Sequence, residues 1–242
     1  MLLDDELLIV CETWRYREQI EQEAAYHFGR LNQQLRAIEA PNGLIAMAEQ
    51  ARDDEIEHAR LCRQIVRRLQ GGAVFQPLQP RTNTDMGPPA GASLSVAQTA
   101  LYCSLALACV TETLSAALLI EMRRLSDDKQ IHATIQRILK DEIQHARIGW
   151  AHLAWEADRS DVRWVGECVP GMICASLRSE REGIKHFPPA AEKFGVLSPQ
   201  SSREIMTASF TEVVFPGLEL HGIDTFPARN TLARLRPPDS AI

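Results

Sequence analysis

One seven-residue phrase occurs twice in this chain and constrains its fold more than any other feature. Residues 54–60 read Asp-Glu-Ile-Glu-His-Ala-Arg and residues 141–147 read Asp-Glu-Ile-Gln-His-Ala-Arg. In each copy a Glu precedes a His by three positions, which places both on one face of a helix, one turn apart. A carboxylate and an imidazole so placed can reach the same metal ion. Two copies on two helices predict two ions or one dinuclear site, with ligands that include Glu55, His58, Glu142 and His145.

The bulk composition narrows the class of protein. With 242 residues, 45% of them hydrophobic, the chain can bury a sizeable core. Its net charge of -6 argues against a nucleic-acid partner, which would need a basic surface. No apolar run approaches the roughly 18–20 residues that span a bilayer, and the N-terminus lacks the basic segment of a secretory signal. Six cysteines without a CxxC spacing indicate reduced thiols. We therefore expect a cytoplasmic protein with no membrane partner.

Helical periodicity predicts an all-α fold. Apolar residues recur at spacings of three, four and seven in four segments, at about 5–40, 44–69, 95–125 and 129–157. Short turns join the first two segments and the last two, so each pair should form an antiparallel hairpin. The Pro- and Gly-rich stretch 70–93 is long enough to run back along a helix. These connections predict a four-helix bundle of two similar hairpins with one long crossover.

Two domains follow from this pattern. The bundle should occupy residues 1–157, and residues 158–242 should form a helical extension that packs on it. Within the extension, 161–186 and 201–214 have helical patterns, and Phe215-Pro216-Gly217 should end the second of them. The tail from about Pro227 is polar and contains proline, so we expect it to be irregular.

The apolar face of each predicted helix is interrupted only by acidic residues or histidine. On the first helix the interrupting residue is Glu21, with Glu18 and Glu23 as alternatives. Burying four carboxylates in one core is untenable unless positive charge lies among them. Because no Lys or Arg shares these faces at that level, a pair of divalent cations is the economical answer. The expected ligands are Glu21, Glu55, His58, Glu112, Glu142 and His145.

This order of ligands resembles the ferritin-like di-iron carboxylate proteins over residues 10–157. The resemblance implies two iron ions, although manganese–iron sites use the same ligands. It also implies that Glu55 and Glu142 bridge the ions and that Glu21 and Glu112 are terminal ligands. Asp54 and Asp141 would accept hydrogen bonds from the ligand histidines, or would instead form surface ion pairs.

The resemblance also directs the functional hypothesis. An O2-activating oxidase or oxygenase would hydroxylate, desaturate or N-oxidise a small organic substrate. Its electrons would come from a separate reductase or from the substrate, because no rubredoxin-type CxxC pair is present. Arylamine N-oxygenases carry an extra histidine ligand one turn before the second Glu-x-x-His motif. This chain has Ile138 at that place, which argues against a close match to them. The alternative is a ferroxidase, iron-handling or peroxide-detoxifying protein, and the chain could form a homodimer. A substrate pocket, or else close helix packing, is expected at Ala24, Ala25, Phe28, Ala108, Ser115 and Ala116.

Overall fold

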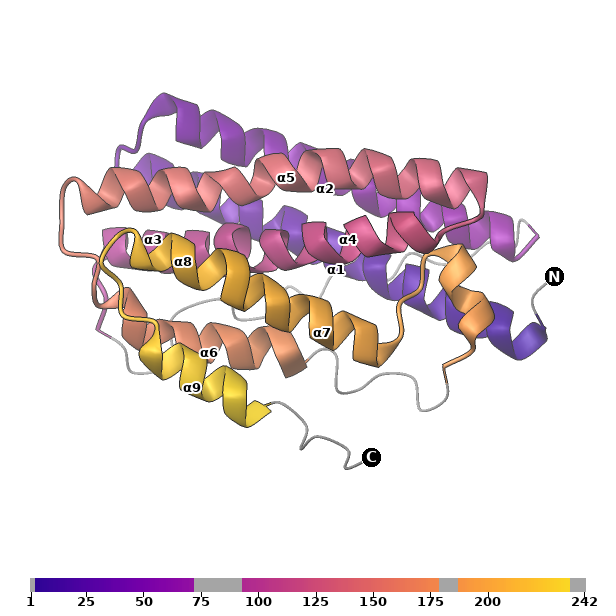
Figure 1. The fold of residues 1–242 in the computed structure, drawn as a ribbon. Coiled ribbons are helices and arrows are strands. Elements are labelled where there is room, and N and C mark those ends of the chain that lie inside the picture. Colours follow the sequence, from indigo (N-terminus) through magenta and orange to yellow (C-terminus); the bar gives the residue numbers. More distant parts are fainter. Residues whose placement is uncertain (1–2, 72–92, 179–186, 236–242) are drawn as a thin grey trace.

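The computed structural model describes residues 3–71, 93–178 and 187–235, and all regular structure in these ranges is helical. The first part of the chain supplies the long helices (Figure 1): α1 (Asp4–Ala37), α2 (Asn42–Leu69), α3 (Val96–Ser104), η1 (Leu105–Glu112), α4 (Thr113–Leu125) and α5 (Lys129–Ala157). The second part supplies shorter ones: α6 (Val165–Arg178), η2 (Pro189–Phe194), α7 (Pro199–Ser209), η3 (Phe210–Val214), α8 (Phe215–Glu219) and α9 (Phe226–Leu235).

Four long helical segments lie side by side and surround the core (Figure 1). They are α1, α2, α5 and the continuous run α3–η1–α4. Helix α1 packs most extensively on α2, and α5 packs on η1, α4 and α2. Both predicted hairpins are therefore present with short connections. The predicted crossover at 70–93 lies almost wholly outside the described residues.

Local sequence explains where the helices begin. The Ser95 hydroxyl accepts a hydrogen bond from the backbone N–H of Gln98, whose side chain accepts one from the Ser95 N–H, a reciprocal capping box for α3. The Asp128 carboxylate accepts from the backbone N–H groups of Gln130 and Ile131 and caps α5. Such caps satisfy backbone donors that a helix leaves without partners at its first turn.

The predicted inward faces are buried as the periodicity indicated. The predicted ligands on all four segments are buried, whereas Ser115 and Ala116, which follow Glu112 on the third segment, are only partly buried. Glu55 and His58 have no exposed surface at all. Helical phase alone therefore located the polar groups that the core must accommodate.

The third long segment differs from prediction because its middle is a π-helix. Residues Leu105–Glu112 form η1, where hydrogen bonds reach one residue farther back than in an α-helix. Consistent with that wider turn, the Thr111 hydroxyl donates to the carbonyl of Ala106, five residues earlier. π-Turns insert an extra residue and occur frequently at functional sites. Here the insertion ends at Glu112.

The same segment corrects the expectation that no stretch is apolar enough to span a bilayer. Helix Val96–Leu125 has 30 residues and a mean hydropathy of 1.9 over its most apolar window, which satisfies the length and composition of a span. However, 61% of that window is buried inside the protein. Core helices of soluble proteins have the same character, because apolar side chains on all sides are covered by neighbouring helices.

The C-terminal helices cover the α3–α4 run. A large hydrophobic cluster joins residues of α3 and η1 to α6, α7, η3 and α9, with Phe210 and Phe215 fully buried in it.

Two predictions in this region are wrong. Residues 215–217 do not end the helix, because α8 follows the π-turn η3 without a break and Pro216 lies directly after that turn. Residues 226–235 form α9, because Ala228 and Leu232, four apart, bury one face of it.

Gly149 permits a close contact between α5 and η1, and we predict that replacing it is destabilising. A Cβ there would lie 2.5 Å from the Cys109 Sγ and 2.7 Å from the Cys109 backbone nitrogen. Because the Cys109 backbone cannot move away without displacing its helix, Gly149→Ala should lower the free energy of unfolding by about 3 kcal/mol. Urea unfolding measures this. Gly171→Ala, where a Cβ meets no atom within 4 Å, is the matched control. Equal stability of the two variants would contradict the prediction.

Candidate metal centre

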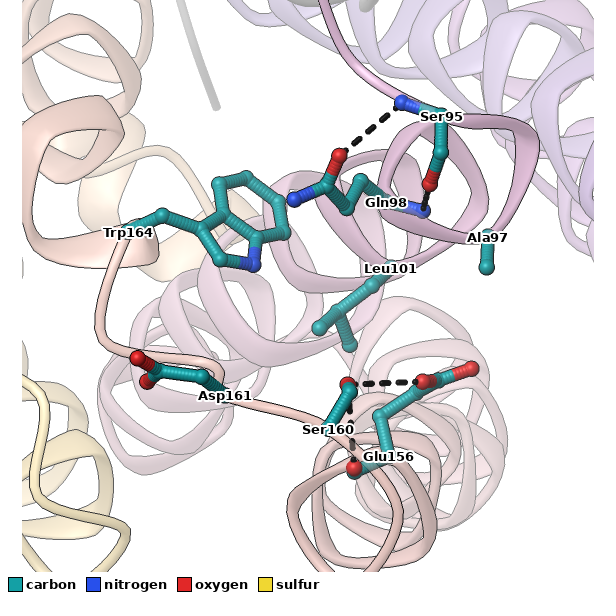
Figure 2. A pocket seen from close by; sticks show the side chains of 8 residues that line it. All are labelled: Ser95, Ala97, Gln98, Leu101, Glu156, Ser160, Asp161 and Trp164. Atoms are coloured by element: carbon teal, nitrogen blue, oxygen red, sulfur yellow. Dashed lines mark hydrogen bonds between the residues drawn. The ribbon is translucent and has the colours of Figure 1, made fainter.

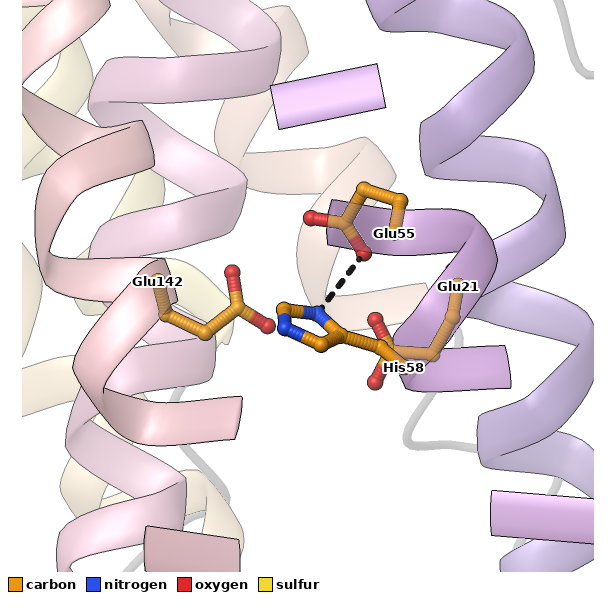
Figure 3. Close-up of side chains that lie close together, drawn as sticks. All are labelled: Glu21, Glu55, His58 and Glu142. Atoms are coloured by element: carbon orange, nitrogen blue, oxygen red, sulfur yellow. Dashed lines mark hydrogen bonds and ion pairs between the residues drawn. The ribbon is translucent and has the colours of Figure 1, made fainter. Parts of the chain in front are cut away.

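The six predicted ligands converge on one buried region from all four long helical segments. They form two overlapping groups, and within each group one potential ligand atom from every residue lies within 4.8 Å of the others. Figure 3 shows the first group, with Glu142 approaching His58 from the opposite side to Glu21 and Glu55. The two groups share two carboxylates. The first consists of Glu21, Glu55, His58 and Glu142, and the second of Glu55, Glu112, Glu142 and His145.

Several polar atoms in this region lack hydrogen-bond partners, which is the property expected of metal ligands. Fully buried oxygens of all four glutamates, and the His145 Nδ1, have no hydrogen bond in the described part of the chain. The His145 Nδ1 approaches the Glu55 Oε1 to 2.9 Å, but not in hydrogen-bonding geometry. Leaving a buried polar atom unsatisfied costs about 1–3 kcal/mol. Atoms that face a common point without bonding one another fit a cation placed between them.

The two histidines present distinct nitrogens to the cluster and to the surface. Each Nδ1 faces the glutamates, with the His58 Nδ1 3.3 Å from the Glu55 Oε2. Each Nε2 lies 3.3 Å from an aspartate of the other motif: His58 from Asp141, and His145 from Asp54. A carboxylate that accepts from Nε2–H leaves Nδ1 as the atom available to a metal. The predicted aspartate–histidine contacts thus exist, and they cross between α2 and α5.

Charge among these groups is balanced by protons in the metal-free protein. Burial raises the pKa of Glu21 and of Glu112 well above the ordinary value, and neighbouring carboxylates raise them further. Burial lowers the pKa of both histidines, but close contacts with the glutamates and the negative charges of these groups outweigh it and raise the pKa of His58 to about 9 and that of His145 to about 11. Burial raises the pKa of Glu142, yet contacts with Glu112 and His145 prevail and lower it to about 2.

An arginine that the sequence reasoning missed reaches this cluster. The Arg17 Nε lies 3.1 Å from the Glu21 Oε1, and its Nη2 donates to the Ser115 hydroxyl at 3.0 Å. That hydroxyl in turn donates to the Glu142 Oε1 at 3.1 Å. The expectation that no basic residue shares these faces is therefore wrong. The signal was present, because Arg17 precedes Glu21 by four positions and so lies on the same face.

The alternatives to Glu21 on α1 fall outside both groups. Glu18 is buried but pairs with Arg63 on α2, whose Nε lies 2.8 Å from its Oε1. Glu23 is partly exposed and accepts a hydrogen bond from Gln19. Of the three candidates, the structure brings only Glu21 to the other ligands.

The six residues expected around a substrate pocket are mostly packed against neighbours. Ala24 and Ala25 are buried, and Phe28 and Ala108 belong to one hydrophobic cluster, where the Phe28 ring contacts His145 edge-on at 5.4 Å between centroids. Ser115 is hydrogen-bonded as described above. Ala116, partly buried, packs against a second cluster. Close helix packing accounts for these contacts, and a substrate pocket here stays a prediction.

A cavity of about 290 Å³ lies instead at the end of α5, beside the start of α3 (Figure 2). Trp164, Leu101 and Glu156 line it, and none of the predicted pocket residues does. Nearby His152 is fully buried, and neither of its ring nitrogens has a hydrogen-bond partner among the described residues. Burial lowers the pKa of His152 to about 4. The His152 Nε2 lies 3.9 Å from the Glu156 Oε1, beyond hydrogen-bonding distance.

No protein-family model, curated protein or solved structure matches this chain. The fold and the site therefore define its class by themselves. This is an all-helical protein whose core holds a carboxylate–histidine cluster that could bind metal.

Proposed function

We propose that the chain is a ferritin-like di-iron protein, an O2-activating oxidase or oxygenase that acts on a small organic substrate in the cytoplasm. The observation that carries the proposal is the sharing of Glu55 and Glu142 by two four-residue groups, which suits two ions held side by side by bridging carboxylates. Mixed oxygen and nitrogen ligands suit iron or manganese. A manganese–iron pair would use the same residues.

Each residue has a proposed role. Glu55 and Glu142 would be shared by the two ions, Glu21 and His58 would complete the ligands of one ion, and Glu112 and His145 those of the other. Asp54 and Asp141 hold the imidazoles by accepting from their Nε2–H groups, which keeps each Nδ1 directed inward. When bound, the iron pair supplies the electrons that reduce O2 and the oxidising power that reaches the substrate.

The residues around the cluster support chemistry that is shielded from bulk water. Phe28, Leu31 and Ile148 are buried on one side of it, and Cys62 and Ile65 on the other. The covering helices α6–α9 add mass beyond what an iron-storage subunit needs, and this favours an organic substrate over iron as the substrate. The hydroxylation, N-oxidation or desaturation of that substrate would draw electrons from a separate reductase or from the substrate itself.

Iron titration under nitrogen, followed by exposure to O2, tests the function. We expect about two Fe(II) per chain, by analogy with other di-iron carboxylate bundles. We also expect O2 uptake that stops after these ions are oxidised unless a reductant is added. Glu156→Gln, which alters a buried glutamate outside both groups, should behave as the wild type. Oxidation of many Fe(II) per chain with growth of a mineral core would favour the ferroxidase alternative instead. Rapid consumption of peroxide in place of O2 would favour a detoxifying role.

A further inference from the structure

The cavity of about 290 Å³ at the end of α5 is acidic and lies apart from the metal centre. Its wall combines the last turn of α5, the start of α3 and the connection from α5 to α6. Glu156 and Asp161 are its charged lining residues, and its described lining contains no Lys or Arg. Glu156 follows His145 by 11 positions on α5, about 16 Å along the axis. A small molecule bound here would therefore not contact the metal ligands.

Of the two acidic groups in this cavity, only Glu156 lacks a basic partner. The Asp161 carboxylate accepts from the Arg163 Nη2 at 2.7 Å and from its Nε at 2.9 Å, so its charge is already paired. The Glu156 side chain is 9% exposed and accepts a hydrogen bond from the Ser160 hydroxyl at 3.3 Å. No Lys or Arg nitrogen of the described residues lies within 4.0 Å of its carboxylate. A nearly buried carboxylate without a counter-ion is unfavourable.

The imidazole behind Glu156 does not neutralise this charge. His152 is fully buried, its Nε2 lies 3.9 Å from the Glu156 Oε1, and neither ring nitrogen has a hydrogen bond in the described part of the chain. Burial lowers the pKa of His152 to about 4, so the ring is uncharged at pH 7. In native proteins, buried polar atoms without partners mark places that bind water or an ion or that carry a function. The charge of Glu156 is thus left for a cation that enters from the cavity.

The lining of the cavity favours an organic cation over a metal ion. Figure 2 shows the Leu101 side chain between the Trp164 ring and the pair Ser160–Glu156, so apolar surface lies beside the carboxylate. An ammonium group that meets the face of an aromatic ring also gains cation–π attraction. The groups of three or more potential metal ligands among the described residues are those of the metal centre. An acceptor beside apolar surface suits a short alkylammonium ion.

We propose that the cavity binds a small primary alkylammonium compound, with its ammonium group on Glu156 and its apolar body against Leu101 and Trp164. A primary ammonium has three N–H donors, and the Glu156 Oε1 and the Ser160 hydroxyl oxygen can accept from them. Its single positive charge matches the single unpaired carboxylate. Because the connection between α5 and α6 supplies Ser160 and Trp164, the bound ligand joins the bundle to the C-terminal helices.

Titration of the full-length protein with n-butylammonium chloride at pH 7 tests the site. The NMR signal of the Trp164 indole N–H, identified as the one missing from Trp164→Phe, reports binding at the cavity. We expect it to shift saturably, with one butylammonium per chain. Glu156→Gln should weaken binding at least about tenfold, because the charge-assisted hydrogen bond is lost. The uncharged n-butanol should bind the wild type at least about tenfold more weakly than butylammonium, for the same reason.

Two further variants make the test specific. Glu167→Gln removes an exposed carboxylate one turn after Trp164 that does not line the cavity, and it is the matched control that should keep the wild-type affinity. Ala97 lines the cavity and is partly exposed, so Ala97→Lys places a tethered ammonium there. This variant should compete with butylammonium and weaken its binding at least about tenfold, and it serves if Glu156→Gln does not fold.

The supporting result is loss of affinity in Glu156→Gln or Ala97→Lys with wild-type affinity in Glu167→Gln. The proposal is refuted if the Trp164 signal of the wild type does not shift, or if n-butanol binds as tightly as butylammonium. Wild-type affinity in folded Glu156→Gln or Ala97→Lys also refutes it. Equal weakening in Glu167→Gln would show nonspecific attraction to acidic surface and would refute it too. None of these results depends on the metals, so the proposed function is tested separately.

Discussion

Replacing Glu142 with alanine is expected to abolish tight binding of both metal ions. Glu142 belongs to both four-residue groups, so its loss removes an oxygen ligand from each ion at once. Removing partners that only support a ligand typically weakens metal binding 10–100-fold, so losing a shared ligand should weaken it by more than about 100-fold. Metal analysis after gel filtration should then find far less than one ion per chain, compared with about two in the wild type.

The contrast with unshared ligands makes this prediction specific. Glu112→Ala and Glu21→Ala each remove a residue that belongs to one group only, and each should leave one ion tightly bound. Glu18→Ala removes a buried glutamate of α1 that lies outside both groups, and it should retain both ions. If Glu142→Ala keeps as much metal as Glu18→Ala, the shared-carboxylate arrangement is wrong.

Removing the metals should lower stability substantially, and the effect should grow with pH. At a free metal concentration about 1,000 times the dissociation constant, each ion stabilises the folded state by about 4 kcal/mol. For a chain of this size that corresponds to a rise in Tm of roughly 8–16 °C per ion. Scanning calorimetry with and without a chelator measures the difference.

The sign of the pH dependence follows from the raised pKa values. In the metal-free protein His58 and His145, with pKa values of about 9 and 11, are protonated throughout pH 6–8, and burial raises the pKa of Glu21 and of Glu112 and so favours their protonated forms. Metal binding must release these protons, so lowering the pH favours the metal-free state. Affinity should fall roughly tenfold per unit of pH for each proton released. This account is contradicted if the difference in Tm with and without the chelator is the same at every pH, or if that difference persists in Glu142→Ala.

Helical phase was sufficient to predict which side chains enter the core. The pairs Glu55–His58 and Glu142–His145 repeat at a spacing of three, and each lies between apolar residues at spacings of three, four and seven. An amphipathic helix buries its apolar face, so polar residues in phase with that face are buried with it. The same reasoning placed Glu21 and Glu112 inside, and all six residues are buried.

Features that depend on the distance between helices were not predictable in this way. Arg17 is long enough to reach across to α4, and its contact with Ser115 joins residues 98 positions apart. The π-turn at Leu105–Glu112 has no signature in the apolar pattern, because residues 105–110 are all apolar and all buried, and a shift of one residue leaves no break in such a run. The tail that looked irregular from its prolines is helical as α9, because contacts with α6 bury one side of it.

The sequence by itself determined that this chain is helical, that its helices pair as hairpins, and that four glutamates and two histidines must share a core. These are consequences of local periodicity and short connections, which act between neighbours along the chain. Only the tertiary structure decided that each aspartate supports the histidine of the opposite motif, and that a buried guanidinium stands beside Glu21. Those contacts depend on the packing of helices from distant parts of the chain, and that packing sets which charges the core leaves unpaired.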